Sequence, residues 1–433
     1  MFGYRYISHR APTRFDFPSP DSLVGEQLIE LTEEVRRAES SRFLCVCKLD
    51  DIWQLHRAGY EARCLPASLP FLLDLVKSEI GQDLSNGRCF VLFDLSGEGH
   101  PFVRESFEDL HGWCQSVGLA RDSVGLLSQN RAMSSEYYRA YGKDMPGVHF
   151  FYYDSIIHAI ANMFASPEGE FLNQFSFSKL ASLDFNEGAV EHPFLCMNAT
   201  PRPLRVAVLA ALSAAGLLPR TIWSLLSKSS GKGAFTDRDV QSFLRRLGRE
   251  NDLYSHALNL LSAPDKCIDD VSITSANQLV WSIDYSAYMQ TCIALVTETD
   301  FTEGQVLRVT EKTIKALAMA RPLILFGNPQ SLSLVRTFGF QTFHPMINEA
   351  YDEITNMSTR FAVACNEIER VNGFTKAELT QLMGSLNEIT MFNAGHARSG
   401  GLNRQYRANV ELPFWNGLCK ELSRSPADCR QIA

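Results

Sequence analysis

Short, uninterrupted apolar runs recur along the chain, and longer amphipathic stretches separate them. A strand covered by helices on both faces is apolar along its whole length, because neither set of alternating side chains meets water. Amphipathic stretches between such strands are typical of crossover helices. In the first half of the chain the runs lie at residues 43–47, 89–93, 124–128 and 148–153. This half therefore predicts a doubly wound α/β domain with a parallel sheet.

The second half of the chain repeats this pattern. Strand-like runs lie at residues 194–198, 293–299 and 322–327, and residues 202–216 predict a helix that ends at a glycine. From about Ile347 the chain is mostly helical, with a Gly-rich break at residues 399–402. We therefore expect an N-terminal α/β domain at 1–190, a second α/β domain at 191–400 and a helical C-terminal tail at 401–433.

Charge and apolar content exclude several classes of protein. The formal net charge is -8, so no overall positive field attracts the chain to nucleic acid or to an anionic membrane. The first residues carry charge and proline where a signal peptide needs an apolar run, and no stretch approaches about 18 consecutive apolar residues. Eleven cysteines without a CxxC pair argue against a secreted disulfide framework. We expect a cytoplasmic protein without a membrane span.

The segment Thr310-Glu311-Lys312 carries the clearest chemical signal, because it opens an apolar helix that leads into a strand. A helix N-terminus offers free backbone N–H groups and the positive end of the helix dipole, which stabilise an anion such as pyrophosphate. Lys312 adds a full positive charge there, and the Glu311 carboxylate can accept hydrogen bonds from the two hydroxyls of a ribose. The alternative is purely structural: Thr310 caps the helix, Glu311 favours its dipole, and the lysines are solvated.

A family resemblance supports the first interpretation. Three segments carry it: CMNATPRPLRVAVLAAL at 196–212, ALVTET at 294–299, and VTEKTIKALAMARPLILFGNP at 309–329, followed by FGFQTF. In this order they resemble the nucleotide-sugar-binding part of fucosyltransferase-like glycosyltransferases. Those enzymes have the GT-B fold, in which two Rossmann-like domains face a cleft. The chain is also similar to uncharacterised phage and bacterial proteins with a Thr-Glu-Lys motif.

The resemblance implies a role for each matching residue. Glu311 would hold the donor ribose and Lys312 the diphosphate, with Thr310 opening the motif, while Arg202 or Arg205 would be a second cation for the phosphates. Glu298 would lie near the transferred sugar. The second domain would thus bind a nucleotide-sugar donor, and the first would bind the acceptor. The donor is a substrate, and no further cofactor is expected.

Glycosyl transfer also needs a base that deprotonates the acceptor hydroxyl. Asp94 and Glu98 follow the apolar run 89–93, at the carboxyl end of a predicted strand, where open α/β sheets place their sites. His100 is a competing candidate, and an ordinary acidic loop is the alternative. Cations and helix dipoles can stabilise a departing diphosphate, so we expect a metal-independent enzyme. The Asp237-x-Asp239 pair is interpreted as helix capping rather than a metal ligand set.

The acceptor is not identified by these residues. Between residues 199 and 250 nine basic residues stand against three acidic ones, and such a patch could follow a nucleic-acid backbone or simply be a solvated surface. We therefore predict a glycosyltransferase that moves a sugar from a nucleotide diphosphate to a hydroxyl on a glycan, a protein or modified DNA. The alternatives are a non-catalytic binding or assembly protein that keeps this fold, and another nucleotide-using α/β enzyme.

Overall fold

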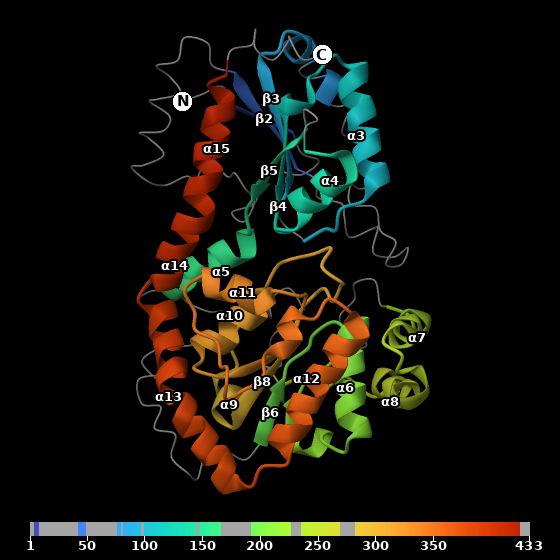
Figure 1. The fold of residues 1–433 in the computed structure, drawn as a ribbon, viewed down its shortest axis with the longest axis vertical. Helices are drawn as coiled ribbons and strands as arrows, with labels where there is room; N and C mark the ends of the chain where they lie inside the picture. Colours follow the sequence, from blue (N-terminus) through green and yellow to red (C-terminus); the bar gives the residue numbers. More distant parts are fainter. Residues whose placement is uncertain are drawn as a thin grey trace. The chain divides into compact units, whose positions relative to one another are not determined.

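Contacts within the chain divide it into two compact units, each described here by itself (Figure 1). Unit 1 comprises Met1–Ile156 and Arg407–Ala433, and unit 2 comprises Ile157–Tyr406. The sequence-based boundaries were placed near residues 190 and 400 instead. The computed structural model describes residues 4–7, 42–48, 76–78, 81–96, 99–143, 147–165, 192–226, 235–268 and 282–424.

Unit 1 contains a five-stranded sheet in which every neighbouring pair is parallel, in the order β1-β2-β3-β4-β5. Its strands are β1 (Tyr4–Ile7), β2 (Phe43–Lys48), β3 (Cys89–Leu95), β4 (Val124–Ser128) and β5 (His149–Tyr152). Helix α3 (Arg104–Ser116) joins β3 to β4, and α4 (Met133–Tyr141) joins β4 to β5. Both crossovers step in the same direction, so the right-handed rule places α3 and α4 on one face of the sheet.

Alternation along the strands builds a separate apolar layer on each face of this sheet. Val91 and Phe93 belong to a core with Phe107 and Trp113 of α3 and Tyr137 of α4. Strand residues of the opposite parity point to the other face. That second face needs its own cover, since α3, α4 and the helical residues 76–78 and 81–85 between β2 and β3 all contribute to the first.

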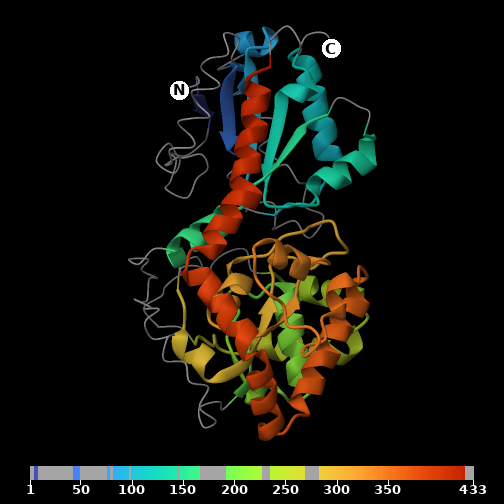
Figure 2. The same ribbon diagram turned by 60° about the vertical axis from the view of Figure 1, so that its left-hand side comes forward.

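The last helix of the described chain, α15 (Leu412–Leu422), provides this cover (Figure 2). Phe414 of α15 packs edge-on against Phe151 of β5, with ring centroids 5.5 Å apart. The Arg42 amide, just before β2, donates a hydrogen bond to the Leu422 carbonyl at 3.1 Å. Because α15 packs on the second face of the unit 1 sheet, the C-terminal segment from Arg407 belongs to unit 1, although the sequence suggested only a helical tail.

Unit 2 contains a four-stranded parallel sheet in the order β7-β6-β8-β9. The strands are β6 (His192–Cys196), β7 (Thr221–Trp223), β8 (Thr291–Thr297) and β9 (Leu323–Phe326). Helix α6 (Pro203–Ala214) connects β6 to β7, and α10 (Glu311–Ala318) connects β8 to β9. These two crossovers step in opposite directions, so α6 and α10 cover opposite faces of the sheet (Figure 1).

Further helices surround this sheet. Helices α7 (Asp237–Arg246) and α8 (Glu250–Ser262) pack on α6, α12 (Met357–Asn372) packs on β9, and α13 (Lys376–Arg398) packs on α10. The other helices of the described chain are α5 (Ser155–Ala165), α9 (Tyr285–Met289), α11 (Ser331–Thr337) and α14 (Gly401–Tyr406). Residues 76–78 and 81–85 of unit 1 are also helical. A π-helical turn lies at Arg407–Glu411, and short 3₁₀ turns lie at Arg121–Ser123, Leu218–Arg220 and Ala350–Glu353.

The predicted fold class is confirmed, since each unit is an α/β structure built on a parallel sheet and the last part of the described chain is helical. The doubly wound arrangement predicted for the first half was wrong, because the crossovers of unit 1 all step in one direction, whereas those of unit 2 step in both. The predicted strands match β2 to β6, β8 and β9 within two or three residues. Two strands, β1 and β7, were missed because each is short and lacks a long apolar run. Within the described ranges, none of the helices combines the length and the apolar character that crossing a membrane requires.

Candidate functional site

The candidate site of unit 2 lies at the carboxyl ends of β6 and β8, which are neighbours at the centre of the sheet. The chain leaves β6 toward one edge through α6 and leaves β8 toward the other edge through α10. At such a topological switch point the two following loops diverge and leave a crevice where ligands of open α/β sheets bind. The N-termini of α6 and α10 both begin at this end of the sheet.

Asn198 connects the strand ends at this switch point. It follows β6, is 2% exposed, and its Oδ1 accepts a hydrogen bond from the hydroxyl of Thr297 at the end of β8. Its amide N–H donates to Ser224 Oγ, after β7, at 3.0 Å, and the Ser224 hydroxyl donates back to the Asn198 carbonyl at 3.0 Å. One buried asparagine thus fixes three strand ends, a role that the sequence analysis did not assign.

Two arginines lie at the beginning of α6. Arg202 is its N-cap residue and is half-buried, and no side-chain hydrogen bond caps this helix. Arg205, in the first turn, is only 5% exposed, and its Nη1 donates to the Thr200 carbonyl at 3.0 Å. The buried guanidinium therefore adds a permanent positive charge to the positive end of the helix dipole.

Glu311 and Lys312 form an ion pair in the first turn of α10. Lys312 Nζ lies 3.2 Å from Glu311 Oε1 and donates to Thr310 Oγ1 at 3.1 Å. Burial favours the protonated form of Glu311, but the positive charges of Lys312 and Lys315 outweigh it and lower the pKa of Glu311 to about 2. Glu311 is therefore ionised at neutral pH.

The charges around Lys312 show which of the predicted residues lie near one another. Burial lowers the pKa of Lys312; Glu311 opposes this shift, the positive charge of Arg205 adds to it, and Glu298 opposes it. Arg205 of α6 and Glu298 after β8 are thus close enough to act on the Lys312 ammonium. The structure gathers four of the six predicted donor-binding side chains, together with Thr310, at one end of the sheet, while Arg202 stands at the start of α6.

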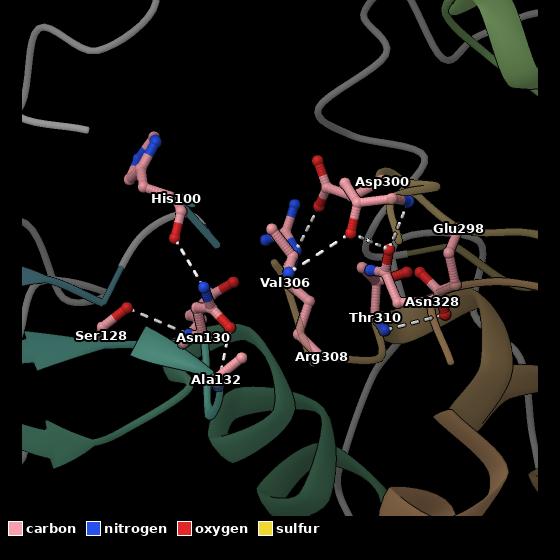
Figure 3. Close-up of polar contacts among 12 residues, drawn as sticks. His100, Ser128, Asn130, Ala132, Glu298, Asp300, Val306, Arg308, Thr310 and Asn328 are labelled. Atoms are coloured by element: carbon pink, nitrogen blue, oxygen red, sulfur yellow. Dashed lines mark hydrogen bonds and ion pairs between the residues drawn. The ribbon is translucent and has the colours of Figure 1, made fainter. Parts of the chain in front are cut away.

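Glu298 is buried against the beginning of α10. It is 2% exposed, and its Oε1 accepts hydrogen bonds from the Thr310 amide at 2.9 Å and from the Thr313 hydroxyl. Figure 3 shows the first of these contacts. Thr310 itself makes no side-chain capping hydrogen bond.

The loop between β8 and α10 is held by two further polar contacts that sequence reasoning missed (Figure 3). Arg308 is 3% exposed, and its Nε donates to Asp300 Oδ2 at 2.8 Å. Asn328, after β9, accepts hydrogen bonds from both the amide and the hydroxyl of Thr302, at 2.7 and 2.8 Å. The signal available in the sequence was a polar residue directly after an apolar run, which Asn198 and Asn328 both satisfy.

The predicted base candidates belong to unit 1, at the carboxyl edge of its own sheet. Asp94 lies within β3, is 2% exposed, and accepts a hydrogen bond from the Ser96 amide at 2.8 Å. Asn130, after β4, donates from Nδ2 to the His100 carbonyl at 2.8 Å (Figure 3). Glu98 lies outside the described residues. This edge is therefore a buried polar cluster that includes the Asp94 carboxylate and His100.

Other sequence expectations concern metals and nucleic acid. Thr236 and Asp239 form a capping box at the start of α7, as predicted for the Asp237-x-Asp239 segment. In the part of the chain that the structure describes, no group of three or more His, Cys, Asp or Glu side chains is arranged to hold a metal ion. In the basic patch, Arg245 pairs with Glu250 at 2.9 Å and Arg249 with Asp252 at 3.2 Å.

Comparison with known proteins gives no match at the level of sequence and a weak likeness to solved structures. No family model matches the chain, and no curated protein matches its sequence. The structure is similar to the crystal structure of an α,α-trehalose-phosphate synthase (UDP-forming) from Burkholderia vietnamiensis, with a TM-score of 0.39 and 11% sequence identity. The match covers 93% of this chain and 80% of that chain. At this level the resemblance to fucosyltransferase-like enzymes stays a prediction, and the function is argued from the site.

Proposed function

We propose that unit 2 binds the nucleoside diphosphate part of a sugar nucleotide and that the protein is a glycosyltransferase. The observation that supports this proposal is the convergence of Arg205 and Lys312 at the N-termini of the two helices that flank the switch point. Two cations and two helix N-termini at one switch point favour a ligand with several negative charges. A diphosphate has this charge and fits the usual position of a nucleotide in open α/β sheets.

Five of the six predicted donor-binding residues have a chemical part in this proposal. Lys312 and Arg205 bind the diphosphate oxygens, and Arg202 adds a third cation at the start of α6. The ionised Glu311 carboxylate accepts hydrogen bonds from the ribose hydroxyls. Thr310 Oγ1, which already accepts from Lys312 Nζ at 3.1 Å, holds the ammonium in place.

The same charges serve catalysis as well as binding. When the glycosidic bond breaks, an oxocarbenium-like sugar forms and the diphosphate leaves with increased negative charge. Fixed cations stabilise that charge more in the transition state than in the ground state, which lowers the barrier. We propose that Arg205 and Lys312 do this without a metal ion. Transfer that continues unchanged in EDTA is the expected result, and loss of transfer that Mg²⁺ restores would contradict it.

Binding of UDP and GDP, measured by isothermal titration calorimetry, tests the donor site. Lys312→Met removes a positive charge from the first turn of α10, and we expect the affinity to fall by about tenfold to a hundredfold, because charge-assisted hydrogen bonds to phosphate are lost. Lys376→Met is the matched control: it removes a charge from the first turn of α13, where Lys376 is exposed. Equal affinities of the two variants would contradict the proposed site.

Mass spectrometry of ligands that co-purify with the wild-type protein tests the class of substrate. A retained sugar nucleotide would identify both the nucleotide and the sugar. A protein that binds neither UDP nor GDP nor any other nucleoside diphosphate contradicts the proposed function. Tight binding without transfer to any hydroxyl acceptor would instead support the non-catalytic alternative.

A further inference from the structure

Glu298 links the central sheet of unit 2 to the first turn of α10. Its backbone N–H donates to the Phe326 carbonyl at 2.9 Å, so the main chain at Glu298 still pairs with β9. Its side chain is 2% exposed, and Oε1 accepts from the Thr310 amide and the Thr313 hydroxyl. One residue therefore contacts the neighbouring strand with its backbone and the helix with its carboxylate.

These contacts replace the capping that α10 lacks. The first four N–H groups of a helix have no partner inside the helix, and an N-cap side chain usually accepts from one of them. Thr310 does not, since its hydroxyl accepts from Lys312 Nζ instead. Glu298, which directly follows β8, caps α10 in place of Thr310. A carboxylate at the N-terminus of a helix also interacts favourably with the helix dipole. The Thr310 hydroxyl is thereby left to hold Lys312.

We infer that Glu298 is a positioning residue that fixes the first turn of α10, and with it Lys312 and Glu311, against the sheet. Contacts run from β8 through Glu298 Oε1 to Thr310 and Thr313, and from Thr310 Oγ1 to Lys312 Nζ. The second carboxylate oxygen, Oε2, is buried and has no hydrogen-bond partner among the described residues. The inference rests on the proposed function only for its effect on nucleotide binding, because the capping contacts stand without a ligand.

Hydrogen exchange in the ligand-free protein tests the positioning directly. Glu298→Ala removes the acceptor, and we expect the amides of the first turn, followed in a peptide covering residues 307–318, to exchange at least fivefold faster. Glu298→Gln keeps an oxygen that can accept both hydrogen bonds, so its exchange should stay within twofold of the wild type. Unchanged exchange in Glu298→Ala overturns the inference.

Asp352→Ala is the matched control, because it removes another buried helix-capping carboxylate from the same unit. Asp352 accepts from the Leu332 and Ser333 amides, at 2.9 and 3.3 Å, and so caps α11. We expect this variant to speed exchange in α11 and to leave α10 unchanged. Faster exchange in the 307–318 peptide of Asp352→Ala, equal to that of Glu298→Ala, would show general loosening of unit 2 and overturn a specific role for Glu298.

The pH dependence of UDP affinity supplies a readout that a merely structural role would not move. Glu311, Arg205 and Glu298 are the charged groups that act on Lys312. The negative charge of Glu298 raises the pKa of Lys312. In Glu298→Gln, Lys312 should lose its proton at a lower pH, so the alkaline loss of UDP affinity should begin at lower pH than in the wild type. An unshifted profile contradicts this electrostatic role. A wild-type protein that binds no UDP contradicts the proposed function instead, and the exchange experiment then decides the positioning role alone.

Discussion

Replacing Glu311 with glutamine should destabilise unit 2 by an amount that depends on pH. Glu311 is 8% exposed, and its Oε1 lies 3.2 Å from Lys312 Nζ. Its pKa of about 2 lies below the ordinary value of 4.5, and at about 1.4 kcal/mol for each pH unit the ionised carboxylate stabilises the folded state by about 3 kcal/mol. Glutamine has nearly the same shape but no charge, so the variant loses this contribution.

The sign of the pH dependence follows from the direction of the shift. Because the folded-state pKa is depressed, the stabilisation is complete above pH 4.5 and is lost as the pH falls toward 2. The difference in unfolding free energy between wild type and Glu311→Gln should therefore be about 3 kcal/mol at pH 7 and narrow to about 2 kcal/mol at pH 3.5. Above pH 5 the difference should be constant until Lys312 begins to lose its proton.

Urea unfolding followed by far-ultraviolet circular dichroism measures this difference at each pH. The matched control is Glu378→Gln: Glu378 also lies in the first turn of a helix, in the capping box of α13, but it is exposed. Its replacement should leave the midpoint nearly unchanged, because glutamine can also complete a capping box. Equal midpoints for the two variants at pH 7, or a Glu311→Gln difference that does not narrow in acid, would refute the assignment of Glu311 as a buried, ionised partner of Lys312.

Four further predictions follow from other parts of the chain. Gly125→Ala should lower the free energy of unfolding in urea by about 1–3 kcal/mol, because its Cβ would lie 2.9 Å from ring atoms of Phe151 and Phe90. Gly112→Ala in α3 is the control and should not destabilise the protein, because no atom would lie within 4 Å of its Cβ. A Gly112→Ala variant less stable than Gly125→Ala would contradict this packing. Phe414→Ala should destabilise unit 1 by about 3–5 kcal/mol, measured in the same way, and an unchanged midpoint would show that α15 is not needed to cover the sheet. If a residue after β3 deprotonates the acceptor, Glu98→Gln should lose sugar transfer and keep UDP affinity, whereas full transfer removes Glu98 from that role. A DNA acceptor predicts salt-dependent duplex retention that falls in the double variant Arg245→Glu, Arg246→Glu, and unchanged retention removes that acceptor.

Much of the fold could be predicted from the chain alone, since the apolar runs have a direct physical cause. A strand that lies between two layers of helices cannot expose polar side chains on either face, so residues 89–95 and 291–297 are apolar almost throughout and were recognised as strands. Strand β7 has only three residues, Thr221–Trp223, and pairing with β6 rather than local preference makes it a strand. The sequence of these three residues alone therefore does not predict a strand.

The candidate site was only partly predictable. Thr310, Glu311 and Lys312 could be found because an N-terminal helix signal and charge stand together in three consecutive residues. The role of Asn198 could not be found in this way, because its partners Thr297 and Ser224 are far from it in the chain. Arg308 was missed for a similar reason, since only the fold of the loop brings its guanidinium to Asp300 and buries it.

The sequence by itself determined that this chain builds parallel sheets with helices between the strands, and that a charged helix start follows one of these strands. Both are local properties, set by the period of apolar residues and by the chemistry of a helix N-terminus. Only the tertiary structure decided that β6 and β8 are neighbours, that Arg205 and Glu298 act on Lys312, and that α15 covers the second face of the unit 1 sheet. Strand order depends on pairs such as Phe194 and Ile293, which are far apart in the chain, and burial depends on how the helices pack on the sheets, so no single stretch of sequence encodes either.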